Sequence, residues 1–330
     1  MNYQLFVSGS PHIHCDESVK KIMLAVIFAL MPALVVSIYY FGLPVIMITL
    51  VSVLSCVVFE YVAQRFFIKG PQTITNYSAI LTGLLLAFNL PSNLALYWVV
   101  LGAFSAIVIG KMAFGGLGNN PFNPALVGRV FLLISRPVEM NTWPIAKPIW
   151  SFNTADVVTG PTPLGILKEG LHENTIEQLI QQGDLPTYAQ MLMGQMGGSF
   201  GEVSTIAVLT GALFLMFRKV ISWHIPVSFI LSAFFLAAIL HFIDPTIYVN
   251  PFFHIVTGGM VLGACFMATD MVTTPNSPWG MILFGTGCGL LTIIIRVFGA
   301  YPEGVSFAIL LMNAFTPLIN RAVKSKKFGT

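Results

Sequence analysis

Long apolar stretches without a charged residue restrict what this chain can fold into. They cover residues 22–59, 70–110, 112–128, 203–217, 220–243, 245–269, 271–295 and 304–320. A helix needs about 20 mostly apolar residues to cross a bilayer. Only 9% of the residues are charged, against roughly 25% in soluble domains. The sequence therefore predicts an all-α, polytopic membrane protein that contacts membrane lipid, and nothing in it indicates a nucleic-acid partner.

The first two apolar stretches are each long enough for two helices. The turn residues Gly42-Leu43-Pro44 divide the first stretch, and residues 89–93 (NLPSN) divide the second, because such Gly, Pro and Asn clusters interrupt helices. Ten transmembrane helices are thus expected. They are placed at residues 22–41, 44–63, 74–90, 94–111, 122–136, 201–217, 222–242, 252–269, 279–297 and 303–320.

The basic residues predict the orientation, because cytoplasmic loops retain Lys and Arg. A cytoplasmic N-terminus places most of them inside: Lys20, Lys21, Arg65, Lys69, Lys111, Arg218, Lys219, Arg321, Lys324, Lys326 and Lys327. The acidic segment between the fifth and sixth helices then lies outside. The expected organisation is a cytoplasmic arm (1–21), a first five-helix unit (22–136), an extracytoplasmic loop (137–200), a second five-helix unit (201–320) and a basic cytoplasmic tail (321–330).

The two helical units resemble each other in sequence. The stretch ILTG at residues 80–83 recurs as IVTG at 255–258, and FGG at 114–116 recurs as FGA at 298–300. Because each unit has five helices, an odd number, the second must enter the membrane from the opposite side. The sequence predicts two inverted repeats, each with a Gly/Pro-rich interruption, FGGLGNNPFNP (114–124) and FGAYPEG (298–304).

Interruptions at matching places in inverted repeats indicate an interior site, since irregular backbone within a membrane must line a cavity or be buried in protein. Polar residues near the interruptions are costly in lipid. We therefore expect an interior ligand site or ion path formed by Asn120, Asn123, Arg129, Asp270 and Glu303. Ordinary turns between helices are the alternative interpretation, with Asp270 and Glu303 at helix ends in water.

One motif in the outer loop carries a chemical signal. Residues 156–162 read DVVTGPT, which has the spacing D-x-x-T-G-x-T. A surface turn is the simple interpretation, with Gly160 giving backbone freedom and Pro161 rigidity. The pattern also resembles the acceptor site at which a flavin transferase joins FMN to a threonine hydroxyl through a phosphoester.

Further stretches extend this resemblance over nearly the whole chain. They are SPH at 10–12, GNNPFNPALVGRVFL at 118–132, ATDMVTTP at 268–275 and YPEGVSFAILLMNAFTPLI at 301–319. With the loop motif, they resemble the D subunits of Rnf-type ion-translocating ferredoxin:NAD oxidoreductase complexes, which are similar to the B subunit of the sodium-translocating NADH:quinone oxidoreductase. The quinone-reducing relative is the alternative assignment within this resemblance.

The resemblance implies a function, a location in a bacterial cytoplasmic membrane and a set of partners. Covalent FMN would be carried by Thr162, with Asp156, Thr159 and Gly160 as recognition positions for the transferase. The partners would be the other complex subunits, including a second flavin-bearing subunit and iron-sulfur subunits, and the transported ion would be Na+ or H+. A second, noncovalent flavin such as riboflavin is expected near the interruptions. Pro161 departs from the more usual alanine before the acceptor.

Other features support no separate site. The four cysteines form no CxxC pair, which makes an iron-sulfur site here unexpected. The segment PHIHCDE (11–17) has possible metal ligands but no second ligand cluster. A GxGxxG nicotinamide fingerprint is absent, so that chemistry is assigned to a partner subunit. A small-solute channel or transporter remains the alternative function, because transporters also use inverted repeats with broken helices.

Overall fold

The computed structural model describes residues 17–68, 72–144, 146, 159–170, 178, 185–194, 196–201 and 204–323. Asp156 lies outside the described residues, and so do the His and Cys residues of the PHIHCDE segment.

The N-terminal half is built of helices whose ends follow the local sequence. Ser18 caps α1 by accepting a hydrogen bond from the Lys21 amide, and Gly42, at φ 66°, joins α1 to α2. A positive φ favours glycine, and Pro44 suits the first turn of a helix. The elements are α1 (Val19–Phe41), α2 (Leu43–Val62), the π turn η1 (Ala63–Ile68), η2 (Ile74–Asn76), α3 (Ser78–Phe88), α4 (Leu96–Phe104), the π turn η3 (Ser105–Ile109), η4 (Met112–Phe114) and α5 (Pro124–Ser135).

Short elements follow before the second set of long helices. They are α6 (Pro137–Asn141), β1 (Trp143–Pro144), β2 (Thr159–Gly160), α7 (Pro163–Gly170) and α9 (Tyr188–Met193). Strands β1 and β2 pair antiparallel, with Trp143 opposite Gly160 and Pro144 opposite Thr159. This two-residue pair is a small departure from the all-α expectation.

The C-terminal half repeats the use of polar N-caps. Ser204 caps α10, and Ser277 caps α14. The elements are α10 (Thr205–Phe217), α11 (His224–Ile243), α12 (Pro251–Val256), α13 (Met260–Leu262), the π turn η5 (Gly263–Met267), α14 (Pro278–Phe298) and α15 (Val305–Ala322).

Six helical segments among the described residues are long and apolar enough to cross a membrane. They are 19–41, 43–68, 96–114, 224–243, 278–298 and 305–322. Each lies at one of the expected spans. Three of the other expected spans correspond to shorter apolar helices, 78–88, 124–135 and 205–217. A polytopic helical architecture is therefore confirmed, while ten crossings in two inverted repeats stay a prediction.

The eighth expected span is not one continuous helix. The chain leaves α12 at Thr257 in an extended conformation and passes Gly258 and Gly259 at φ 67° and 65° before α13 begins. These two glycines tolerate backbone that other residues rarely adopt. The expectation of a single helix over 252–269 is therefore wrong, because the Thr-Gly-Gly sequence ends α12 after two turns.

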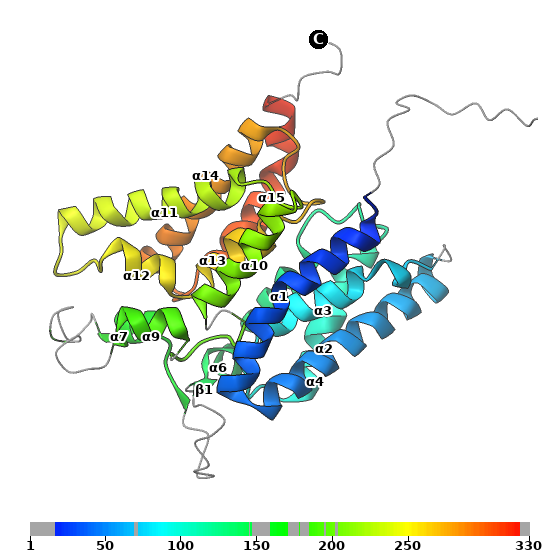
Figure 1. Cartoon of the computed structure of the whole chain (residues 1–330), viewed down its shortest axis with the longest axis horizontal. Helices are drawn as coiled ribbons and strands as arrows, with labels where there is room; N and C mark the ends of the chain where they lie inside the picture. The colour runs from blue at the N-terminus through cyan, green and yellow to red at the C-terminus, as the bar shows by residue number, and fades with distance from the viewer. Residues whose placement is uncertain are drawn as a thin grey trace, which may run out of the picture.

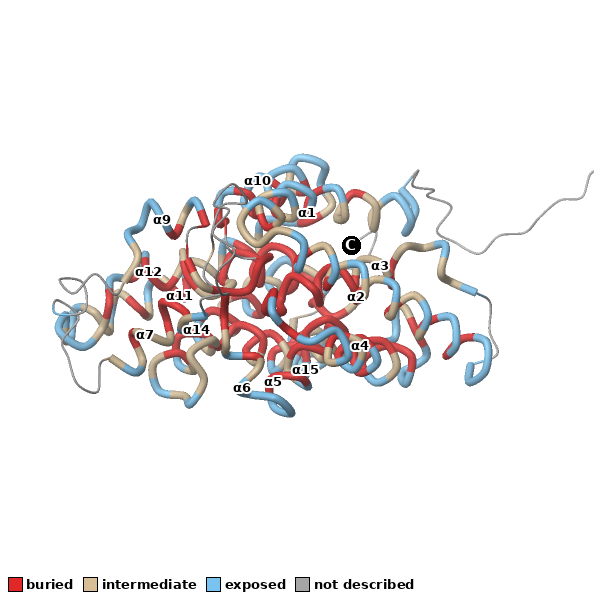
Figure 2. Tube along the Cα trace, turned by 90° about the horizontal axis from the view of Figure 1, so that it is seen from below, coloured by how far each residue is buried: buried red, intermediate tan, exposed pale blue. Residues whose placement is uncertain are grey.

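Helices from the two halves pack against each other through a buried centre. Figure 1 shows α2 and α4 on one side and α11, α12 and α14 on the other, with α1 and α10 side by side between them. The approach of α1 to α10 is close: a Cβ on Gly211 would lie 2.0 Å from the Ala29 carbonyl oxygen. Small residues permit such contact between membrane helices. In Figure 2, the buried residues gather in the middle of the molecule, and the exposed ones form its outside.

The two ends of the helical region differ in what they carry. Figure 1 shows the start of α1 and the end of α15 on one side of the molecule. The short elements α6, β1, α7 and α9 lie on the opposite side. The described part of the 137–200 segment therefore lies on the side of the molecule opposite the start of α1 and the end of α15.

Candidate functional site

Thr162 stands directly before α7 and caps that helix. Its Oγ1 accepts a hydrogen bond of 3.0 Å from the Gly165 amide, and its carbonyl oxygen accepts one from the Ile166 amide. Threonine is a good N-cap because its side-chain oxygen satisfies an amide left free in the first helical turn. The last threonine of the motif is therefore at the positive end of a helix dipole.

An ion pair lies beside Thr162. Arg129 of α5 donates to the carboxylate of Glu303, which lies in the turn before α15. Arg129 also donates to the side-chain oxygen of Asn89 at 2.5 Å. Arg129, Glu303 and Thr162 line one small cavity of about 20 Å³, and Glu303 and Thr162 line a second of about 10 Å³. We call these three residues and their two cavities the Thr162 site.

Lys168 of α7 forms hydrogen bonds with the backbone that follows α14. The Lys168 ammonium donates to the carbonyl oxygen of Gly299 and, at 3.2 Å, to that of Tyr301. These carbonyls follow the C-terminus of α14, where positive charge is favourable. Partial burial lowers the pKa of the Lys168 ammonium. The contact connects the helix that Thr162 caps with the second Gly/Pro-rich interruption.

The Thr162 site is closed. The residue is only 5% exposed, and each neighbouring cavity has room for about one water molecule. A surface turn is the simple interpretation of this motif in the sequence, and for the side chain of Thr162 that interpretation is wrong. Packing of α7 against the helical region covers it, which local sequence does not reveal.

A second site lies between the two helical halves. Its cavity measures about 90 Å³ and is lined mainly by apolar side chains of α1, α3, α5, α10 and η5. The polar groups that line it include Asn120, Asn123 and Asp270. Asn123 donates to the Met267 carbonyl oxygen at 3.1 Å, whereas the buried side-chain oxygen of Asn120 accepts no hydrogen bond from the described residues. An apolar cavity with a few converging polar groups is typical of a ligand site; we call it the Asn120 pocket.

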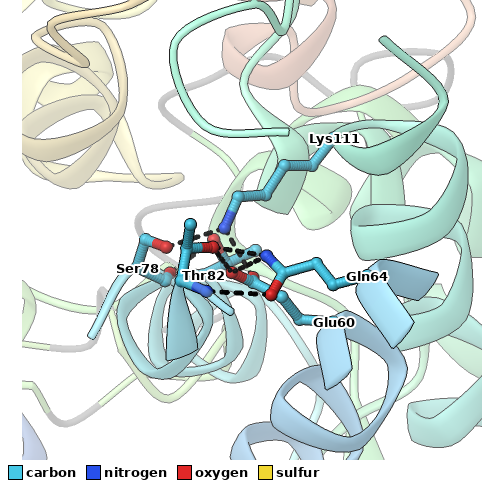
Figure 3. Close-up of polar contacts among 6 residues, drawn as sticks. Glu60, Gln64, Ser78, Thr82 and Lys111 are labelled. Atoms are coloured by element: carbon cyan, nitrogen blue, oxygen red, sulfur yellow. Dashed lines mark hydrogen bonds and ion pairs between the residues drawn. The ribbon is translucent and has the colours of Figure 1, made fainter. Parts of the chain in front are cut away.

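Lys111, which lines this pocket, belongs to a buried ion pair. The Lys111 ammonium lies 2.6 Å from Oε2 of Glu60 and 2.8 Å from the Ser78 hydroxyl, as Figure 3 shows. The side chains of Lys111 and Glu60 are 2% and 0% exposed. Oε1 of Glu60 accepts from the Thr73 hydroxyl at 3.1 Å and from the Gln64 amide at 3.4 Å. Burial of both charges is tolerated because each has a charged partner and further hydrogen bonds.

The structure divides the predicted interior residues between two places. Asn120, Asn123 and Asp270 line the Asn120 pocket, together with residues of the first interruption. Arg129 and Glu303 belong to the Thr162 site, with Tyr301 and Pro302 of the second interruption. The two interruptions therefore line different cavities, and the ligand or ion function expected of these residues stays a prediction.

Two functional candidates are not identified from the sequence. Lys111 is predicted as a base of a cytoplasmic loop, but it is 1% exposed and faces Glu60. In the sequence, Glu60 is only the charged residue that follows the first apolar stretch, 22–59. The available signal was that both charges lie within or beside expected spans, where charged residues usually pair with each other. Each also lies near a π turn, η1 or η3, a geometry often found at functional sites.

These features define a multi-pass helical membrane protein with two interior sites that contain polar residues, one of them beside a threonine-capped helix of the long connecting segment. Comparison with known proteins agrees with this class. The chain belongs to the NQR2, RnfD, RnfE family, whose model matches residues 6–329.

Several relatives match almost end to end. The D subunit of the proton-translocating ferredoxin:NAD(+) oxidoreductase complex of Clostridium ljungdahlii is 45% identical, with 98% of this chain and 96% of the relative covered. The D subunit of the Na(+)-translocating ferredoxin:NAD(+) oxidoreductase complex of Acetobacterium woodii is 43% identical, with 98% and 95% covered. The D subunit of the ion-translocating oxidoreductase complex of Stutzerimonas stutzeri is 38% identical, with 95% and 93% covered.

Proposed function

We propose that this chain is the membrane-embedded D subunit of an ion-translocating oxidoreductase complex that links ferredoxin with NAD and moves Na+ or H+. In this proposal, Thr162 carries FMN through a phosphoester and so serves as an electron relay. The names of the relatives support the complex. The observation that carries the flavin proposal is that the threonine of the D-x-x-T-G-x-T motif caps α7 beside Arg129.

The residues around Thr162 suit a phosphate group. A helix N-terminus favours an anion through its free amides and its dipole. A guanidinium has five N–H donors, and the described residues account for two of those of Arg129, toward Asn89 and Glu303. Arg129 can therefore donate to a phosphate while it remains paired with Glu303. When bound, the flavin supplies one- and two-electron chemistry, and the chain supplies its tether and N–H donors for the phosphate.

The flavin assignment is tested by peptide mapping of natively expressed protein. We expect the peptide that contains Thr162 to carry the mass of FMN less water. Denatured protein in a gel should also fluoresce as a flavin, because the tether is covalent. A bare Thr162 in protein coexpressed with its transferase would contradict the proposal and favour a solute channel.

We also propose that the Asn120 pocket holds the second, noncovalent flavin, such as riboflavin. The buried oxygen of Asn120 accepts a ligand N–H or O–H donor, and Asn123, Lys111 and Asp270 add polar groups around a mostly apolar cavity. The volume of about 90 Å³ is below the roughly 150 Å³ of a cavity that admits benzene. Binding of a three-ring flavin therefore requires the surrounding helices to move apart.

The change Asn120→Ala tests this second site. It removes the unpaired acceptor, and a hydrogen bond to a buried ligand contributes on the order of 1 kcal/mol, so we expect about a fivefold weaker retention of noncovalent flavin. The measurement is the ratio of acid-extracted riboflavin to protein after purification. Asn119→Ala is the matched control, since the neighbouring Asn119 is exposed. Equal flavin content in both variants, or none in the wild type, would contradict the proposal.

A further inference from the structure

The acceptor hydroxyl of Thr162 is inaccessible in the folded chain. Thr162 is 5% exposed, and its Oγ1 is engaged by the Gly165 amide at 3.0 Å. The residues just before Thr162 are fixed as well, because Thr159 and Gly160 form strand β2, which pairs with Pro144 and Trp143 of β1. A transferase that acts on Thr162 must surround this oxygen and the residues on both sides of it. The arrangement that places Thr162 at the site therefore prevents its modification.

Among the residues that the structure describes, helix α7 is attached to the helical region by a small set of contacts. Leu164 and Leu167 of α7 pack in a cluster that is separate from the main core, with Met191, Met196, Val249 and Phe253. Leu164 lies so close to Gly258 that a Cβ there would be 2.4 Å from its side chain. Lys168 adds the polar contact to the carbonyls of Gly299 and Tyr301.

A segment as short as α7 can detach while the remaining helices stay folded. Segments with few buried apolar contacts open locally at a free energy below that of global unfolding. The cluster has six buried members, whereas the main core runs through all the long helices. Release of Lys168 and the two leucines would free α7 and expose Thr162, while α5, α14 and α15 stay packed.

We infer that α7 is a docked segment that must open for flavin transfer, and that Lys168 is the positioning residue that holds it closed. This inference rests on the proposed function of Thr162. In the reaction, the Thr162 oxygen attacks the flavin-side phosphorus of a flavin dinucleotide (FAD). The new phosphorus–oxygen bond replaces the phosphoanhydride bond, AMP leaves, and the hydroxyl proton passes to a base of the transferase or to water. No oxidant or reductant is needed.

The inference predicts that loosening the Lys168 contact accelerates modification. Full-length chain is purified from cells without transferase and is then incubated with purified flavin transferase and FAD. Thr162-linked flavin is measured over time by gel fluorescence and peptide mass. Lys168→Met should raise the initial rate on the order of tenfold, because a charged hydrogen bond that favours the closed form is lost. Leu164→Ala should act in the same direction through lost packing.

Two controls separate this effect from general damage. Lys168→Arg keeps a cationic donor and should restore a rate near that of the wild type. Glu169→Gln changes a charge on the exposed neighbour of Lys168 and should leave the rate unchanged. The thermal unfolding midpoint of the helical region is measured for every variant, and a rate increase counts as support where that midpoint is unchanged.

The outcomes also distinguish the inference from the proposed function. Flavin on Thr162 at equal rates in wild type, Lys168→Met and Leu164→Ala would overturn the inference and leave the proposed function intact. Absence of flavin on Thr162 in every variant, with a competent transferase and FAD, would overturn both.

Discussion

Thr162→Ala is expected to remove all covalent flavin from the chain and to abolish electron transfer from ferredoxin to NAD in the assembled complex. The physical reason is that a phosphoester needs a hydroxyl oxygen, and alanine has none. The variant still folds, because loss of an N-cap costs only about 1 kcal/mol. The measurements are gel fluorescence of the denatured chain and ferredoxin-dependent NAD reduction by membranes.

The chain contains a matched control for this change. Thr187 caps α9 in the same connecting segment, and its side chain accepts from the Gln190 amide. Thr187→Ala should therefore cost a similar amount of stability and leave the flavin in place. Thr162→Ser should keep the acceptor oxygen and at least part of the label. Full fluorescence in Thr162→Ala would show that the flavin is bound elsewhere.

Lys111→Met is expected to destabilise the protein by about 3–5 kcal/mol, because it leaves the Glu60 carboxylate buried without its charged partner. The Lys111 ammonium lies 2.6 Å from that carboxylate, and both side chains are almost completely buried. Methionine retains much of the length of lysine, so the lost charge dominates the effect. The measurement is the thermal unfolding midpoint of the detergent-solubilised chain.

Two comparisons make this prediction specific. The double variant Glu60→Gln/Lys111→Met removes both charges and should recover most of the lost stability, because no lone charge remains. The Arg136–Glu139 pair is the control, since its atoms are 3.9 Å apart and its side chains are 48% and 41% exposed. Glu139→Gln should change stability by less than about 0.5 kcal/mol. Equal midpoints for wild type and Lys111→Met would disprove the proposed role of the pair.

Much of the helical architecture could be predicted from the sequence. Apolar length locates a membrane helix directly, so all six long helical segments coincide with expected spans. The turn at Gly42 could also be predicted, because glycine supplies the positive φ that the chain needs there. The break after α12 was missed, although its Thr-Gly-Gly sequence is visible, since glycine also occurs within continuous helices such as α3.

Prediction of the sites was less complete. The D-x-x-T-G-x-T spacing identified Thr162 as a candidate acceptor, and the polar residues at the interruptions identified Asn120, Arg129 and Glu303. These patterns did not reveal that the residues form two separate sites. Nor did they reveal that Lys111 faces Glu60, because 51 positions separate the two and no local pattern relates them.

Residue type and spacing alone were enough to predict a helical membrane protein, to locate its long helices and to find the threonine that matches a flavin acceptor. These properties depend on residue type and spacing along one segment. Three features became visible only in the packed chain: Thr162 is covered by the packing of α7, the distant charges of Lys111 and Glu60 pair with each other, and the interruptions line different cavities. Burial and pairing depend on which distant helices come into contact, and many packings of the same helices satisfy the same pattern of apolar residues.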